Sequence, residues 1–491
     1  MDKKTILVTG ASGYIASRLI PRLLAAGYLV RCMARHPERL RHRGWYAQVE
    51  TVSADATEPG TLPAALQDVR VAYYLIHNMA AGHGYEQLDL QSARAFAQAA
   101  KLAGVEHIVY LGALADESED LALHLKSRIE TGMALREAGV PVTEFRAGII
   151  VGPGSVSFEM VRFLAEQFPL MVGPNWLRHA TQPIATRNVL DYLLAALDTP
   201  ACRGLIFEIA GGDRMTYAES MSRFAEVRGL KRAMLLLPVV PLWLMALFIE
   251  QLTPVHRSYA TPLIQGLRND SIVTARPAAG LSLHSAAAQV FPDIRLQGYT
   301  ESVQSALADL NPDTVERIWL DLDRDAVRIK HEGMFVDYAR FSSHAPADAV
   351  FAQVCRIGGR DGWPGLDWAW QLRGRMDRWV GGRGMAGRDD PLLEGSRLDF
   401  YRVDRLTTPV QEGERQPQPK LMRLRAELKV PGEGWMEWKV TPQSEGCLLE
   451  QTIFFAPKGL PGFLYWYLNY PVHRLVFDRL AKALIRQAEA S

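Results

Sequence analysis

The stretch that most constrains the fold is a glycine-containing turn near the amino terminus, Val8-Thr9-Gly10-Ala11-Ser12-Gly13-Tyr14-Ile15-Ala16. It follows an apolar run at residues 6–8 and precedes a segment whose apolar residues recur at helical spacing. Glycine suits a strand that turns tightly into a helix, where the backbone takes a positive φ or lies against a ligand. We therefore predict a strand, a turn and a helix, with the amides of the first helical turn open to an anion.

The length and the charge of the chain limit the number of domains and the kinds of partner that can be expected. The chain has 491 residues, 48% of them hydrophobic, which is enough for two or three domains. Lys and Arg number 55 against 54 Asp and Glu, so nucleic acid is not expected as a partner. The four cysteines lack metal-ligand spacing, which indicates a reducing compartment and no metal site. Because the chain enters a strand at once, without a signal-peptide pattern, we expect a cytoplasmic protein.

One stretch without charge stands apart from this pattern. Residues 233–249 read AMLLLPVVPLWLMALFI, at the lower edge of the length that spans a bilayer. Pro238 and Pro241 interrupt the stretch, so a continuous membrane helix is not expected. We expect a buried helix or a lid over a substrate cleft, with contact to a membrane surface as the alternative.

Apolar runs alternate with helical patterns through the first 150 residues. Strands are expected at residues 28–35, 49–55, 71–77, 107–112 and 142–150, and helices at 84–103 and 121–138. Alternation at this spacing predicts right-handed crossovers and an α/β fold with a doubly wound, Rossmann-like parallel sheet. In such folds, ligands bind outside the carboxyl ends of the strands.

The glycine turn, with Ala16 in place of a last glycine, and the segment RAGIIVGPG from Arg146 share a pattern with a known superfamily. Over about 230 residues the chain resembles the extended and atypical short-chain dehydrogenases/reductases. It is most similar to the branch with the NmrA-like regulators and a complex I accessory subunit. The resemblance implies an NAD(P)-binding domain at residues 1–310, with a substrate lobe at about 150–300.

The end of the second expected strand decides between the two nicotinamide dinucleotides. An acidic residue there binds the ribose 2′-hydroxyl of NAD, whereas a cation suits the 2′-phosphate of NADP. This chain has Arg35 and, one helical turn on, Arg39, with no carboxylate at the strand end. NADP is therefore expected in preference to NAD, and a solvated surface arginine is the alternative.

Other cofactor contacts follow from the turn and from the resemblance. The turn would hold the phosphates, and Asp55 stands where the superfamily has an aspartate near the adenine amino group. Residues at the ends of the fourth and fifth strands would lie along the pyrophosphate and the nicotinamide ribose. The expected cofactor-binding set is Gly10, Ser12, Gly13, Tyr14, Ile15, Arg35, Asp55, Ile76, His77 and Leu111.

The Ser-Tyr-Lys pattern of the superfamily is missing. No hydroxyl follows the fifth strand, and His124 and Arg128 occupy the i and i+4 positions of the tyrosine and lysine on the next helix. Imidazole titrates near neutral pH, so His124 is a candidate proton donor, with Arg128 on the cofactor ribose or phosphate. The alternative is that both residues only contact a bound dinucleotide, because arginine cannot repeat every role of lysine.

The sequence pattern changes after about residue 312. Apolar and charged residues alternate at 422–430 and 436–440, which is typical of antiparallel strands with one face in solvent. Residues 432–434, Gly-Glu-Gly, are expected to turn between two of these strands. Further strands are expected at 396–407 and 448–455, and a long helix from about residue 461.

This order resembles the helix-grip plan of the START and Bet v 1-like proteins, in which a curved sheet wraps a C-terminal helix. The resemblance implies a second domain at residues 311–491 and a space for an apolar small molecule. Arginines at 358–390 lie among tryptophans but also among aspartates, so a salt-bridged surface is expected there.

Two functions fit these observations. The first is an NADP-dependent oxidoreductase of the atypical type, acting on an apolar carbonyl or quinone. The second is a non-catalytic NADP(H)-sensing regulator or assembly factor. In that case residues 233–249 and the C-terminal domain would dock on a protein or membrane partner.

Overall fold

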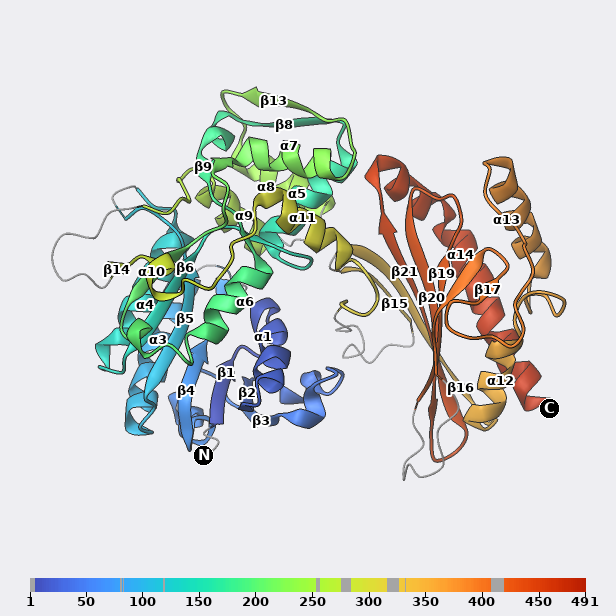
Figure 1. Cartoon of the computed structure of the whole chain (residues 1–491), viewed down its shortest axis with the longest axis horizontal. Helices are drawn as coiled ribbons and strands as arrows, with labels where there is room; N and C mark the ends of the chain where they lie inside the picture. Colours follow the sequence, from blue (N-terminus) through green and yellow to red (C-terminus); the bar gives the residue numbers. More distant parts are fainter. Residues whose placement is uncertain are drawn as a thin grey trace. The chain divides into compact units, whose positions relative to one another are not determined.

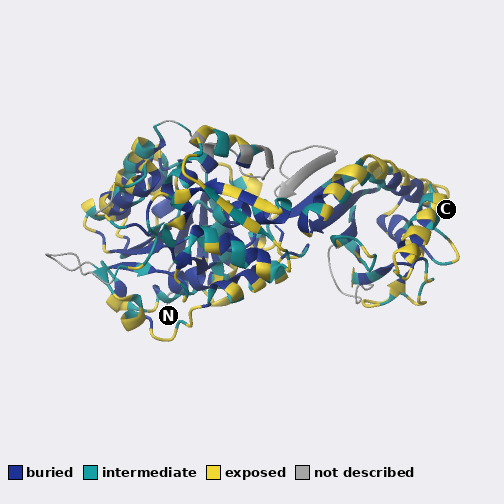
Figure 2. Cartoon of the chain, turned by 90° about the horizontal axis from the view of Figure 1, so that it is seen from above, coloured by how far each residue is buried: buried dark blue, intermediate teal, exposed yellow. Residues whose placement is uncertain are grey.

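The computed structural model describes residues 5–79, 82, 84–117, 120–252, 257–274, 284–315, 326–331, 333–407 and 419–491. Among them, the residues up to Asp309 form one compact unit, called unit 1 below. Residues 310–315 and those from 326 onward form unit 2. In both units the strands are largely buried, and the helices turn exposed faces outward (Figure 2).

Unit 1 is built on an eight-stranded parallel sheet in the order β14-β11-β6-β5-β4-β1-β2-β3 (Figure 1). The strands are β1 (Thr5–Thr9), β2 (Leu29–Ala34), β3 (Glu50–Ser53), β4 (Val69–Tyr74), β5 (His107–Ala113), β6 (Val142–Ala147), β11 (Ile206–Ile209) and β14 (His284–Ser285). The predicted doubly wound α/β fold is confirmed. Because the strand order reverses between β1 and β4, a crevice opens at their carboxyl ends.

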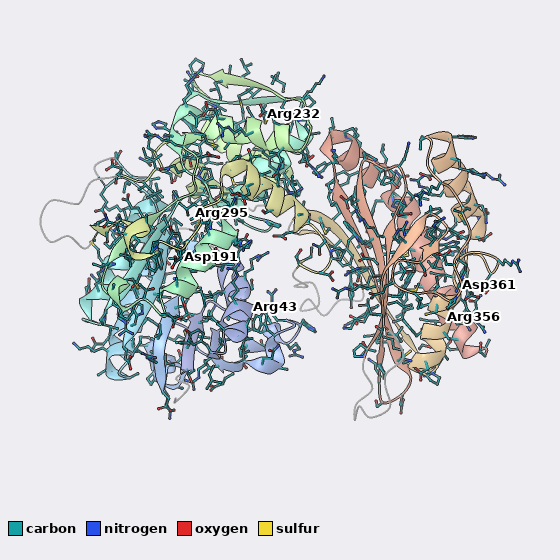
Figure 3. The ribbon with its side chains drawn as sticks, in the orientation of Figure 1. Arg43, Asp191, Arg232, Arg295, Arg356 and Asp361 are labelled. Carbon is teal, nitrogen blue, oxygen red and sulfur yellow. The ribbon has the colours of Figure 1, made fainter. Side chains whose placement is uncertain are left out.

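Helices cover both faces of this sheet. On one face lie α1 (Tyr14–Ala25) and α6 (Thr186–Ala195), which Arg22 and Asp191 join through an ion pair of 2.6 Å (Figure 3 labels Asp191). On the other face lie α2 (Leu62–Leu66), α3 (Tyr85–Leu102) and α4 (Leu123–Glu137). Burial on both faces explains the continuous apolar runs in the strand sequences.

Shorter elements form a lobe beside the carboxyl ends of the strands (Figure 1). The strands of the lobe are β7 (Ile150–Val151), β8 (Leu170–Pro174), β9 (Ala180–Thr181), β10 (Ile184–Ala185), β12 (Met215–Thr216) and β13 (Ala233–Leu237). The main helices of the lobe are α5 (Val156–Gln167), α7 (Tyr217–Val227), α8 (Leu242–Leu252), α9 (Arg257–Gly266) and α11 (Tyr299–Ala308). Helix α10 (Ala287–Val290) packs against β11 of the main sheet.

For the uncharged stretch at 233–249 the sequence predicts a buried helix or a lid over a substrate cleft, and the structure shows two elements there in place of one buried helix. The stretch divides into β13 and α8, with Pro238 and Pro241 in the connection between them. Proline cannot continue a helix from its amino side, so the second element starts only after Pro241. In the described part of the chain, every helix is too short or too polar to cross a membrane.

Unit 2 has a seven-stranded antiparallel sheet in the order β15-β16-β21-β20-β19-β18-β17. The strands are β15 (Ala326–His331), β16 (Met334–Ser343), β17 (Arg397–Leu398), β18 (Tyr401–Leu406), β19 (Lys420–Ala426), β20 (Gly432–Pro442) and β21 (Cys447–Pro457). The helices are α12 (Ala347–Arg356), α13 (Asp367–Trp379) and α14 (Gly459–Glu489). Trp466 of α14 stacks on Phe335 and Phe455, with ring centroids 5.2 and 5.6 Å apart. The C-terminal region is thus α+β, with its last helix packed on the sheet.

The hairpin turn expected at 432–434 is wrong. Those residues are the first three of β20, and β19 ends at Ala426, so residues 427–431 connect the strands. A Cβ on Gly432 would lie 2.5 Å from the carbonyl oxygen of Ala456. Glycine is therefore needed here for the close approach of β21, and not for a turn.

Candidate functional site

A cavity of about 710 Å³ in unit 1 lies at the crevice between β1 and β4 and extends into the lobe. Its walls come from the carboxyl ends of the central strands, from the start of α1 and from α4, α5, α7, α8 and α9. The residues singled out from the sequence all line it: Gly10, Ser12, Gly13, Tyr14, Ile15, Arg35, Asp55, Ile76, His77, Leu111, His124 and Arg128.

The glycine turn presents backbone amides to this cavity. Gly10 has a φ of 62°, and a Cβ there would lie 3.0 Å from the carbonyl oxygen of Leu75, so a side chain is excluded. Gly13 is the N-cap of α1 with an ordinary φ of −79°, so it needs no left-handed conformation. No side chain caps α1, and its first turn carries no acidic residue. The first-turn amides are therefore available to an anion in the cavity.

Tyr14 contributes its backbone to the turn, whereas its side chain is engaged elsewhere. The hydroxyl is 2.7 Å from Oγ1 of Thr186, at the start of α6. The guanidinium of Arg18 lies over the ring, 4.0 Å from its centroid. The first contact joins the start of α1 to the start of α6 and leaves the Tyr14 hydroxyl without a role at the expected phosphate position.

Two charged residues stand at the ends of β2 and β3. Arg35 is exposed and lines the cavity, and among the described residues its guanidinium makes no hydrogen bond or ion pair. Asp55 accepts hydrogen bonds from the backbone and side chain of Thr57 through Oδ1, at 2.9 and 2.8 Å. The second carboxylate oxygen of Asp55 has no partner in the described part of the chain. One unpaired cation and one available acceptor thus face the same end of the cavity.

Two histidines and an arginine gather where β4, β5 and α4 meet. Burial and, as a smaller contribution, the charge of Arg128 together lower the pKa of His124 to about 4. His77 lines the cavity and is exposed at its wall, and the surrounding protein lowers its pKa to about 3 by desolvation, with smaller contributions from Arg128 and His124. Both imidazoles are therefore neutral at pH 7. The expectation that His124 titrates near neutral pH does not hold in this environment.

Asp89 of α3 is a residue that the sequence reasoning missed. Its buried carboxylate accepts hydrogen bonds from the backbone and side-chain amides of Asn78, at 2.7 and 3.1 Å, and from Oγ of Ser127, at 3.2 Å. Asn78 lines the cavity, and Ser127 lies between His124 and Arg128 on α4. Asp89 thus ties the loop after β4 to the helix that carries both candidate residues. The available signal was a carboxylate seven residues before Phe96, on the buried face of a predicted helix.

A buried ion cluster fixes the other side of α4. Glu144 of β6 is fully buried and pairs with Arg136 of α4 at 2.6 Å and with Arg146 at 2.7 Å. Arg146 also pairs with Glu117, in the loop before α4. A Cβ on Gly132 would lie 2.4 Å from Glu144, so the helix approaches β6 closely only because glycine is present. The position of α4 is therefore set by charge pairing as well as by apolar packing.

The lobe end of the cavity is apolar. Tyr217 lines it, but its hydroxyl donates to the carbonyl oxygen of Asn269 at 3.2 Å. Ser155 likewise uses its hydroxyl on the carbonyl oxygen of Ile150, at 2.7 Å. The remaining lining is mainly aliphatic and sulfur-containing: Val156, Met160, Val161, Leu164, Val172, Leu177, Met221, Met245, Ile249, Leu263, Ile264 and Leu267. This chamber suits an apolar molecule.

The depressed histidine pKa predicts acid sensitivity. In the unfolded chain His124 takes up a proton below about pH 6.5, whereas in the folded chain it does so only near pH 4. The free energy of unfolding is therefore highest above pH 6.5 and decreases between pH 6.5 and pH 4. At pH 5 the loss amounts to about 2 kcal/mol for a fully buried histidine. His124→Gln should therefore lose about 2 kcal/mol less than the unmodified protein between pH 7 and pH 5. Urea unfolding at both pH values measures the difference, and equal losses would refute the burial of a neutral imidazole.

Two known families match the chain, one within unit 1 and the other within unit 2. The NmrA-like family matches residues 2–159. A second family, described as a protein of unknown function (DUF2867), matches residues 330–480. The first match covers the glycine turn, β1 to β6 and α4, and the second covers most of the antiparallel sheet and its terminal helix.

Several curated relatives match part of the chain. The (4-alkanoyl-5-oxo-2,5-dihydrofuran-3-yl)methyl phosphate reductase of Streptomyces griseus is 31% identical over 231 residues, 46% of this chain and 74% of the relative. The ceramide reductase of Caulobacter vibrioides is 26% identical over 239 residues, 48% of this chain and 73% of the relative. A photosystem II assembly factor, Ycf39 of Cyanophora paradoxa, is 27% identical over 144 residues, 29% of this chain and 44% of the relative.

Among solved structures, the triphenylmethane reductase of Citrobacter sp., complexed with NADP(H), is 20% identical. The match covers 62% of this chain and 99% of the other, with a TM-score of 0.48. The family assignment rests on sequence: the NmrA-like match over the first six strands, and a relative above 30% identity that is covered over most of its length. The chain therefore belongs to the NmrA-like family, among the atypical short-chain dehydrogenases/reductases that its first 230 residues resemble.

Proposed function

We propose that unit 1 binds NADP(H) and reduces a carbonyl or quinone group on an apolar substrate. The observation that carries the proposal is the pairing of an uncapped helix start with an unpaired arginine, Arg35, at the end of the neighbouring strand. The diphosphate would lie against the amides at the start of α1, and Arg35 would bind the 2′-phosphate. Asp55 would accept a hydrogen bond from the adenine amino group through its unpartnered oxygen.

The residues around α4 suit reduction without the usual tyrosine. Bound NADPH would supply a hydride to the electrophilic carbon of the substrate. The guanidinium of Arg128 lines the cavity and has no carboxylate partner in the described structure, so it would stabilise the negative charge that develops on the substrate oxygen. His124 is neutral and would donate a hydrogen bond to that oxygen, with water as the final proton source.

The shape of the cavity supports an apolar substrate. The reacting group would lie near His124 and Arg128, while the body of the molecule fills the chamber lined by α5, α7, α8 and α9. Two of the relatives are reductases, one of an alkanoyl-substituted dihydrofuranyl methyl phosphate and one of ceramide, which supports reduction as the reaction class.

Arg35→Asp tests the preference for NADP. A carboxylate in place of the guanidinium should weaken NADPH binding about 100-fold, by repulsion of the 2′-phosphate, and leave NADH affinity within a factor of about three. Arg39→Asp is the matched control, because Arg39 is exposed one helical turn away and does not line the cavity. Fluorescence titration measures both affinities. Equal weakening of NADPH and NADH in Arg35→Asp would remove the assignment of the 2′-phosphate to Arg35.

The alternative function is nucleotide sensing without turnover. It is favoured by the lack of a hydroxyl group at Leu111-Gly112-Ala113, the last three residues of β5, where the superfamily has its serine. An assay of NADPH oxidation with a panel of apolar aldehydes, ketones and quinones distinguishes the reductase from the nucleotide sensor. Acceptor-dependent oxidation supports the reductase, whereas saturable binding without oxidation supports the sensor.

For unit 2 we propose an apolar small molecule as ligand, on the strength of its topology. The last helix, α14, lies against the sheet through Phe463 and Trp466, which both contact Phe335, and Trp466 also stacks on Phe455. Native mass spectrometry of the purified full chain would reveal a copurified hydrophobic molecule. A mass equal to the bare chain would count against this assignment.

A further inference from the structure

The two-stranded pair of β8 and β13 is apolar on both faces. The strands pair in parallel, with Val172 opposite Leu235. On the inner side Met171 is buried in the lobe. On the outer side Leu170, Val172, Leu235 and Leu237 are each between 36% and 54% exposed, and Val172 also borders the cavity. A two-stranded sheet at the protein surface ordinarily has polar side chains on its solvent-facing side, so this apolar outer face indicates an interaction site.

The helix that follows continues the same face. Trp243 of α8 is 69% exposed and Leu247, one turn later, is 45% exposed. From the same helix, Met245 and Ile249 line the cavity. Helix α8 is therefore apolar toward solvent and toward the candidate substrate chamber, and forms a single-helix wall between them. The apolar face is defined by Leu170, Val172, Leu235, Leu237, Val239, Trp243 and Leu247.

Charges around the apolar face have one predominant sign. The segments that form it, residues 167–177 and 233–249, contain no charged residue. At their borders Arg178 and Lys231 are exposed, whereas Glu166 is buried and paired with Arg228 at 2.6 Å. Arg232, labelled in Figure 3, donates to the carbonyl oxygens of Ala165 and Glu166 and holds β13 against the end of α5. Glu250 closes the second segment and is only half-buried.

We propose that this apolar face lies on an anionic lipid bilayer, with α8 as the wall across which an apolar substrate passes from lipid to the cavity. The binding of this face to a bilayer is inferred from exposure and charge alone. The passage of a substrate past α8 rests on the proposed function. A tryptophan at the edge of an aliphatic patch with cations at its borders matches the layered chemistry of a bilayer surface. Interfaces between proteins contain about one hydrogen bond per 100–200 Å². Because the exposed side chains of the apolar face offer only the Trp243 indole as a hydrogen-bonding group, a lipid surface fits this face better than a protein partner does.

Sedimentation with vesicles tests the proposal on the full chain. The unmodified protein should sediment with vesicles of 30% phosphatidylglycerol in phosphatidylcholine, less with pure phosphatidylcholine, and less at high salt. Leu235→Glu combined with Trp243→Glu should reduce vesicle affinity at least tenfold, because charges would enter the acyl region. Neither side chain lines the cavity, so the melting temperature and NADPH affinity should be unchanged.

Trp379→Glu is the matched control, because Trp379 of α13 in unit 2 is an equally large and even more exposed side chain, at 86%. It should leave vesicle binding intact. Loss of binding in Trp379→Glu but not in the double variant, or no sedimentation of the unmodified protein, would overturn the proposal. So would light scattering that shows a dimer dissociated by the double variant, since the face would then join two copies. Vesicle binding that persists in a protein without NADPH affinity would count against the proposed function and not against this surface.

Discussion

Replacing Gly13 by aspartate is expected to abolish NADPH binding and to leave the protein as stable as before or slightly more stable. Gly13 is the N-cap of α1, with a φ of −79° and a ψ of 164°, a conformation that aspartate adopts without strain. Its Cβ would meet the carbonyl oxygen of Gly10 at 3.1 Å, a contact that a shift of a few tenths of an ångström relieves. The new carboxylate would accept from the first-turn amides and take the place of the cofactor phosphates.

The expected loss of NADPH affinity is at least 100-fold, because a fixed negative charge would face the diphosphate in an enclosed site. The melting temperature should stay constant or rise, since an aspartate N-cap contributes about 0.5–2 kcal/mol relative to an uncapped start. Gly13→Asn separates the effect of the negative charge from that of the side-chain shape. Asparagine caps the helix as well as aspartate does, so this variant should retain more affinity for NADPH than Gly13→Asp. NADPH affinity unaffected by aspartate would mean that the dinucleotide does not lie on this turn.

Arg128→Gln is expected to lower kcat by about 100-fold or more, with a small change in KM for NADPH. A fixed cation beside the reacting oxygen acts mainly on the charge that develops in the transition state, so its loss should appear in kcat. The same substitution should raise the pKa of His124 and His77, because Arg128 lowers both. NMR titration of the histidine resonances gives this second readout, which a merely structural role would not move.

Arg128→Lys is the control for charge, since lysine keeps the cation with a different geometry. It should recover part of the kcat and keep the histidine pKa values low. His124→Gln should have a smaller effect than Arg128→Gln, because a neutral imidazole contributes only a hydrogen bond. If Arg128→Gln turned over apolar acceptors at the original rate, the electrostatic role would have to be assigned to another group.

The parts of the site carried by contiguous sequence were predictable. The turn at 8–16 sets its own geometry, because strand, glycine and helix follow one another within a few residues. Arg35 and Asp55 were placed correctly at the cavity because parallel strands bring their carboxyl ends to one edge. His124 and Arg128 shared a face because they are four residues apart on one helix.

The substrate chamber could not be read from the sequence in the same way. Met160, Met221 and Ile264 come from three helices, and each looks like an ordinary core residue within its own segment. The chemical state of His124 was also out of reach, since its pKa depends on burial against Gly266 and on Arg128. The turn before β20 was mispredicted because glycine serves both turns and close strand contacts, and only the neighbouring strand distinguishes them.

Isothermal titration calorimetry of the full chain with NADPH, in parallel with Gly13→Asp, tests the central claim most directly. We expect one saturable NADPH site per chain in the unmodified protein, weaker binding of NADH, and no measurable heat with Gly13→Asp. No heat with either coenzyme, or the same heat in the variant, would contradict it.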